Sequence, residues 1–156
     1  MTFSKKDLVV EVRFEIGKDA NGYPKSRDAE ALLCKPLKRD CSLCVVASVP
    51  FYVRDVAYGD TITTSVAPSG ALQFREVVKR SGYSVYRILL RESLKKTEVI
   101  NRLLDFGVLL EQDGNLLAFA VSPSTDVDAI VDYLLEGKRS GLWGTQDGYI
   151  FEAAAH

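Results

Sequence analysis

The chain has 156 residues, of which 47% are apolar, and its 20 basic and 21 acidic side chains give a net charge of −1. This length suits one ordinary domain or two very small ones, and the apolar fraction excludes a disordered chain. The balanced charge favours neither nucleic acid nor anionic membranes, and no apolar run approaches the roughly 20 residues that span a bilayer. The first residues lack the apolar core of a signal peptide, so we expect a cytoplasmic protein.

Alternation of apolar and polar residues from Leu8 to Ile16 predicts a half-buried strand. Residues 17–28 are polar and contain Asn21-Gly22, which is typical of a loop. Further strands are expected where apolar and β-branched residues lie between turn signals, at 29–37, 41–49, 61–66 and 71–79, with an irregular stretch or one helical turn at 51–58. Residues 1–80 are therefore predicted to form a small antiparallel β-barrel-like half.

The remainder of the chain mixes strand and helix patterns. We expect strands at 83–90, 108–112 and 116–121, a helix capped by Ser93 and ended by Gly107, and a type I′ turn at Asp113-Gly114. A second helix should begin after Ser124 or Thr125 and end at Gly137 and Gly141, before closing strands at 142–144 and 149–151. This β-α-β-β-α-β order predicts a ferredoxin-like half over 81–152, and an α+β protein whose two halves pack as one unit.

Histidine is almost absent from the chain. His156 follows three alanines, so we expect 153–156 to be a tag linker. The commonest general base and metal ligand is thus missing, and no phosphate loop, dinucleotide fingerprint or nucleophile elbow occurs. We expect a binding protein without cofactor or metal. An enzyme that uses Asp or Tyr chemistry is a remaining alternative.

Three cysteines lie close together in the sequence, at Cys34, Cys41 and Cys44. Their odd number argues against a disulfide framework. Cys41 and Cys44 have the C-x-x-C spacing of zinc and redox sites, but zinc wants four ligands, and the residues after Cys44 look like a strand rather than a helix. Buried core residues are the favoured interpretation, and a metal or redox site is the minor one.

The segment 50–60 is the strongest candidate for a functional surface. It combines three aromatic residues, an arginine and two aspartates in an irregular stretch, which is the composition of protein-binding hot spots. With two arginines from the basic stretch that follows, the candidate partner-binding residues are Phe51, Tyr52, Arg54, Asp55, Tyr58, Asp60, Arg80 and Arg87. The alternative is structural: Phe51 and Val56 would plug the barrel, and Asp60 would organise a turn.

Two other ligand classes follow from a ferredoxin-like half. RNA-recognition modules carry charge and aromatics on their third strand, whereas 116–121 has one aromatic and no charge, so nucleic acid is not expected. Amino-acid-binding regulatory domains, which such halves resemble, hold ligands near a strand-to-helix loop, and Arg91-Glu92-Ser93 occupies that place. A small-molecule sensor is therefore the alternative function.

Short motifs resemble a bacterial family catalogued as domain of unknown function 4265. They are Val49-Pro50-Phe51, Tyr58-Gly59-Asp60-Thr61-Ile62, Phe74 to Gly82, and Tyr86-Arg87, and the resemblance covers roughly residues 8–150. Where family members often have a His-x-Thr arrangement, this chain has Tyr83 and Val85. The resemblance implies a small accessory protein of no assigned activity.

Taken together, the residues favour a non-catalytic protein that caps a toxin-like partner protein, as an immunity or antitoxin-type inhibitor does.

Overall fold

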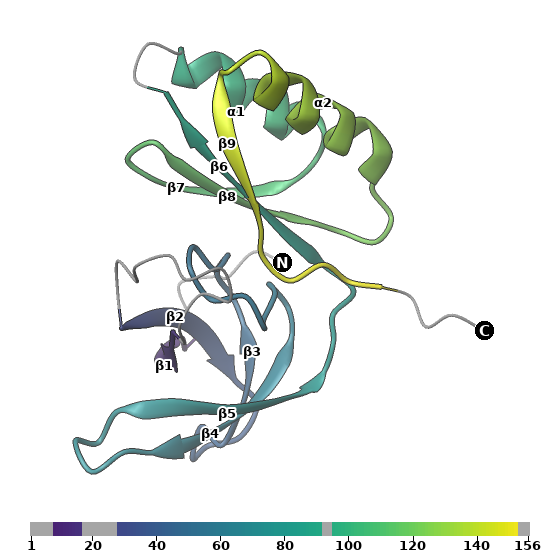
Figure 1. The fold of residues 1–156 in the computed structure, drawn as a ribbon. Coiled ribbons are helices and arrows are strands. Elements are labelled where there is room, and N and C mark those ends of the chain that lie inside the picture. Colours follow the sequence, from purple (N-terminus) through teal and green to yellow (C-terminus); the bar gives the residue numbers. More distant parts are fainter. Residues whose placement is uncertain (1–7, 17–27, 92–94, 153–156) are drawn as a thin grey trace.

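A computed structural model describes residues 8–16, 28–91 and 95–152. The first half is a closed barrel of five strands (Figure 1), and its strands are β1 Val10–Glu15, β2 Ala29–Pro36, β3 Leu43–Val46, β4 Thr61–Val66 and β5 Leu72–Lys79. Neighbouring strands pair in chain order and antiparallel. The barrel closes through a short parallel pairing of β1 with β5, at Val12–Leu72 and Arg13–Gln73. The predicted barrel-like half is confirmed, although its closure is parallel.

Alternate residues of the barrel strands fill its interior. Val12, Phe14, Leu32 and Ile62 are almost completely buried there. The rings of Phe14 and Phe74 stack with centroids 4.5 Å apart, which joins β1 to β5 beyond their short backbone pairing. Cys34 and Cys44 are buried in this core and Cys41 is half-buried, with all three thiols free. The predicted core role of the first two is confirmed.

The second half is a four-stranded antiparallel sheet with two helices (Figure 1). Its elements are β6 Ser84–Leu90, α1 Lys96–Asp105, β7 Leu109–Asp113, β8 Leu116–Val121, α2 Val127–Arg139 and β9 Trp143–Asp147. The strand order is β7-β8-β6-β9, and both helices lie on the face that points away from the barrel. The protein is therefore α+β, as predicted.

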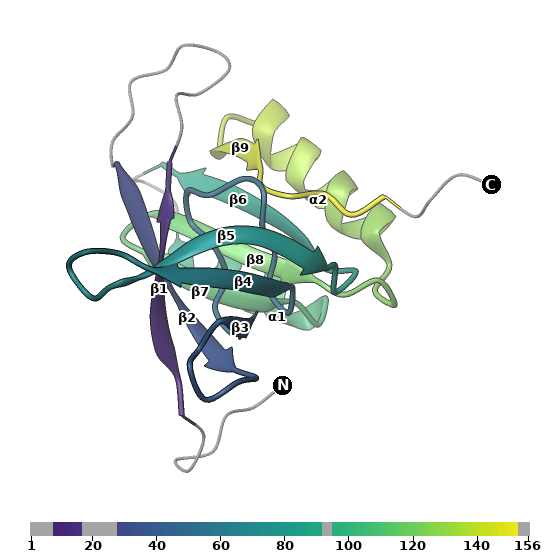
Figure 2. The same cartoon turned by 90° about the horizontal axis from the view of Figure 1, so that it is seen from below.

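The barrel covers the other face of this sheet, as Figure 2 shows from the barrel side. Tyr86, Ile88 and Leu90 pack toward the helices, while Val85 lies in a cluster with Val49 and Ala57 of the connection between β3 and β4. Ala118 and Ala120 of β8 belong to the same inter-half cluster. A strand that is buried on both faces needs no polar alternation, which explains the wholly apolar sequence of β8.

The structure corrects one predicted helix end and confirms two others. Asp126, not Ser124 or Thr125, caps α2, because its carboxylate accepts from the N–H groups of Asp128 and Ala129. The predicted cap Ser93 lies outside the described residues. Gly107 and Gly141 do have the positive φ of residues that follow a helix.

Three further predictions were wrong in detail. Gly137 lies inside α2 and does not end it. The β7–β8 turn consists of Gly114 and Asn115, and only Gly114 has a positive φ, whereas a type I′ turn needs two. One closing strand, β9, replaces the two expected, because residues 149–151 have no strand pairing beyond a bond from the N–H of Val85 to the carbonyl of Tyr149.

Neither helix of the described chain is long and apolar enough to cross a membrane.

Candidate functional site

Six of the eight candidate residues lie on the connection between β3 and β4, residues 47–60, here called the junction loop; Arg80 and Arg87 contact it from the end of β5 and from β6. It has no helix or strand and runs between the barrel and the second sheet. Val49 and Ala57 pack against Val85 of β6. Val56 packs into the barrel core. The predicted irregular stretch is therefore confirmed, and it is the seam that joins the two halves.

Arg87 of β6 binds the first part of the junction loop from the sheet side. Its side chain is 1% exposed, and its Nε–H donates to the carbonyl of Pro50 at 3.1 Å. Its two Nη groups donate to the carbonyls of Tyr52, at 3.4 Å, and Val53. Burial lowers the pKa of Arg87 to about 10, which leaves it charged at neutral pH. One guanidinium thus satisfies three loop carbonyls.

Glu30 of β2 binds the same loop from the barrel side. Its carboxylate accepts from the N–H groups of Phe51 at 2.7 Å, and of Tyr52 and Val53 at 3.0 Å each. The carboxylate of Glu111, on β7, accepts from the N–H of Val49, and burial raises the pKa of Glu111. The loop backbone is therefore held by one cation through its carbonyls and by two carboxylates through its N–H groups.

Neither carboxylate was among the predicted site residues. Glu30 carries a sequence signal, because it alternates with Leu32 and Cys34 on the inward-facing side of β2. A charge at a core position needs a partner, so the pattern could have marked it. Glu111 carries no such signal, since polar residues occur on both faces of its strand, β7.

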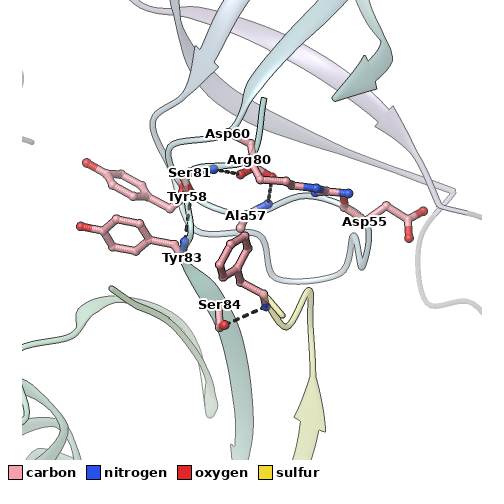
Figure 3. A network of polar contacts seen from close by, with 9 residues as sticks. Asp55, Ala57, Tyr58, Asp60, Arg80, Ser81, Tyr83 and Ser84 are labelled. Atoms are coloured by element: carbon pink, nitrogen blue, oxygen red, sulfur yellow. Dashed lines mark hydrogen bonds and ion pairs between the residues drawn. The ribbon is translucent and has the colours of Figure 1, made fainter. Parts of the chain in front are cut away.

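Asp60 organises the second part of the junction loop (Figure 3). It is fully buried, and its carboxylate accepts from the N–H groups of Ala57 at 2.9 Å and Ser81 at 2.8 Å. Arg80 forms an ion pair with it at 2.9 Å and also donates to the carbonyl of Asp55 at 2.7 Å. The guanidinium of Arg80 lies over the ring of Tyr149, 3.8 Å from its centroid.

Gly59 and Ser81 meet beside this network. The hydroxyl of Ser81 donates to the carbonyl of Tyr58 at 2.7 Å and accepts from the N–H of Tyr83 at 3.1 Å. Gly59 has φ +84, and a Cβ there would lie 2.9 Å from that of Ser81. The motifs Tyr58-Gly59-Asp60 and Arg80-Ser81-Gly82 are therefore two halves of one structural contact.

The structure divides the eight candidate residues by exposure. Asp60 and Arg87 are buried and bonded internally, so their assignment to a partner-binding surface is corrected: both hold the junction loop in place. Tyr58 is 7% exposed and packs edge-on against Tyr83, with ring centroids 5.2 Å apart. The residues that remain accessible are Arg54 and Asp55, which are exposed, and Phe51, Tyr52 and Arg80, which are half-buried.

The structure also describes the places considered for RNA, for a small molecule and for a metal ion. The sheet face that RNA-recognition modules use is covered by the barrel. Arg91 is exposed, but Glu92 and Ser93 lie outside the described residues. Within the described ranges, His, Cys, Asp and Glu form no group of three or more that could hold a metal ion.

The fold thus defines an α+β protein in which a closed barrel is bonded through its β3–β4 connection to a helix-covered antiparallel sheet. The chain belongs to the family described as domain of unknown function DUF4265, whose model matches residues 32–145. It is similar in structure to a hypothetical protein from Neisseria gonorrhoeae, known from a crystal structure, with a TM-score of 0.71 and 12% identity over 92% of this chain and 98% of that one. That likeness shows the fold alone. No curated protein matches the chain.

Proposed function

We propose that the protein has no catalytic activity of its own and caps a partner protein, as an immunity or antitoxin-type inhibitor, through the exposed tip of the junction loop. The tip consists of Arg54 and Asp55, with Tyr52 and Arg80 half-buried beside it. Arginine and tyrosine are among the side chains most enriched in binding hot spots.

The observation that carries this proposal is the fixed geometry of the tip. Before it, Val53 is held by Glu30 and Arg87; after it, Ala57 is held by Asp60. Only three residues separate these anchors, and one of them, Val56, is fully buried. A loop that is already ordered loses little conformational entropy on binding, so it can serve as a rigid recognition element.

Two finer assignments belong to the same proposal. Along the chain, a helix follows β6 and another follows β8, the first and third of the four strands of this sheet. Together with the spatial order β7-β8-β6-β9, this arrangement supports a ferredoxin-like half at 81–152, packed on the barrel half at 1–80. Three free thiols support a cytoplasmic location, because secreted proteins of this size tend to oxidise theirs.

The first experiment is native mass spectrometry of the chain purified from its source organism at its natural abundance. We expect a stoichiometric protein partner. Once this partner is purified, Arg54→Ala and Tyr52→Ala should each weaken the complex by about 2 kcal/mol, roughly 30-fold in Kd. A partner that arrests growth when it is expressed alone, and not with this chain, would support the inhibitor assignment.

Arg75→Ala is the matched control, because Arg75 is also an exposed arginine of the barrel half but lies on β5. Equal loss in the Arg75 and Arg54 variants would place the binding surface elsewhere. A purified chain that carries a metabolite and no protein partner, and that the metabolite stabilises in thermal unfolding, would replace this proposal with the small-molecule sensor.

A further inference from the structure

The outer edge of β9 presents unused backbone groups. In the part of the sheet that the structure describes, β9 pairs with β6 alone. The N–H of Arg91 donates to the carbonyl of Leu142, and the N–H of Gly148 donates to the carbonyl of Val85. In an antiparallel pair every second residue bonds to the neighbouring strand, so residues 142 and 148 and the even-numbered residues between them face β6. The N–H and C=O groups of Trp143, Thr145 and Asp147 therefore point outward. No hydrogen bond to these groups is found among the described residues.

The sequence of β9 has little of the usual protection of an edge, since Asp147, its last residue, is its one charged side chain. Natural edge strands carry lysine, proline or a bulge that prevents pairing with another chain. The strand has the sequence WGTQD, and Gly144, its second residue, is exposed, with no atom within 4 Å of the position that a Cβ would take. Another backbone can therefore approach this strand closely.

Exposed apolar side chains flank both faces of this edge. On the barrel side, Leu89 is 58% exposed beside Gly144, and Leu142 is 39% exposed. On the helix side, Val127, Val131 and Leu135 recur every fourth residue along α2, and the first and last are 37% and 41% exposed.

The apolar flank of α2 points away from α1. Tyr133 is on the opposite flank, where its ring lies between that of Phe106, at the end of α1, and the indole of Trp143, with centroids 5.7 Å and 5.3 Å away. Because α2 packs on β9 and α1 packs on β7, the flank of α2 that lies away from α1, with Val127 and Leu135, faces the edge of the sheet at β9. Large apolar residues rarely gather at a surface that stays in water.

The charges around β9 are arranged to suit a second copy of the same strand. At the start of the strand, the last turn of α2 carries Lys138 and Arg139; at its end, Asp147 is exposed. Asp147 pairs with Tyr86 in register and therefore projects to the helix side, where Lys138 also lies. A second β9 that runs antiparallel would bring the acidic end of each strand to the basic end of the other.

We propose that the protein forms a two-fold dimer in which β9 pairs antiparallel with β9 of a second copy, about Thr145. The two four-stranded sheets become continuous, and the apolar flanks of the two α2 helices meet across the axis. This interface goes beyond the proposed function and uses a different surface from the junction-loop tip.

The test measures the mass of the purified full chain by light scattering over a concentration series. We expect twice the monomer mass of 17.3 kDa. Leu135→Lys, at a surface position, should weaken the dimer at least about tenfold in Kd. Thr145→Pro should do the same by removing an outward N–H, with its thermal unfolding as the check on folding.

A charge exchange makes the test specific. Asp147→Lys alone should weaken the dimer, and so should the double change Lys138→Asp with Arg139→Asp, because each places like charges together. All three changes in one chain should restore it, while Arg75→Asp on β5 should have no effect. A monomer at every concentration overturns the proposal, and so does a dimer that neither Leu135→Lys nor Asp147→Lys weakens.

Discussion

The indole of Trp143 lies directly against the backbone of Gly137 in α2. A methyl group at position 137 would stand 2.0 Å from Cζ2 of the indole, and the indole N–H donates to the carbonyl of Leu134 at 3.1 Å. The first residue of β9 is thus fastened beneath the helix, and only glycine allows this approach.

We therefore expect Gly137→Ala to destabilise the protein by at least about 2 kcal/mol, because the indole must move out of a packed core. The sign is informative, since alanine for glycine within a helix otherwise stabilises by about 1 kcal/mol. Denaturant unfolding measures the difference. Gly144→Ala is the control and should change the free energy of unfolding by less than about 0.5 kcal/mol.

Arg87 should be irreplaceable as the partner of the junction-loop carbonyls. Arg87→Met keeps most of the side-chain volume but leaves the carbonyls of Pro50, Tyr52 and Val53 without their donor, so we expect a loss of about 3 kcal/mol or more. Limited proteolysis should show faster cleavage within the junction loop. Arg75→Met, at an exposed position on β5, should leave both measurements nearly unchanged; equal effects would contradict the assigned role.

Asp60 should be sensitive to loss of its charge alone. Asp60→Asn preserves shape, but its amide cannot accept from all three of the donors on Ala57, Arg80 and Ser81, so we expect a loss of about 2 to 3 kcal/mol in the free energy of unfolding. Asp55→Asn changes an exposed carboxylate in the same loop and should have little effect. Similar losses in the two variants would mean that the network in Figure 3 contributes little.

The buried thiols should make the protein less stable in alkali. Burial raises the pKa of Cys34 from 9.0 to about 12 and that of Cys44 to about 11. Above pH 9 the unfolded thiols lose protons that the folded thiols retain, so their contribution to stability is complete below pH 9 and is lost as pH rises toward 11 to 12. Unfolding at pH 7.5 and pH 10 should show a smaller difference for Cys34→Ala than for the parent chain.

Thiol labelling gives an independent check of the same burial. At pH 8 the half-buried Cys41 should react with a disulfide reagent, while Cys34 and Cys44 should react only on unfolding. Fast reaction of all three thiols in the folded protein would contradict the buried positions in the barrel.

Local patterns of the sequence were sufficient for much of the fold. The strand at 61–66 and the helix-ending glycines Gly107 and Gly141 were predicted correctly, because strand period and left-handed backbone are set within a few residues. The same reasoning located the junction loop but gave all its charged residues one role. Alternation shows that Arg87 shares a face with Val85 and Leu89, but not that a barrel covers this face near Arg87 and leaves Leu89 exposed.

Apart from the closing strands, the sequence by itself determined the element types, their order and the change from a barrel pattern to a mixed strand and helix pattern, because these follow from periodicity and turn chemistry. Only the tertiary structure decided what the polar residues do. Asp60 lies about 20 residues before Arg80 and Ser81 in the chain, and the three become one network when β4 and β5 bring their ends together. Gly137 was predicted to end α2, because a glycine near the end of a helical pattern is typical of a helix C-terminus, and only the packed structure shows that it makes room for the indole of Trp143.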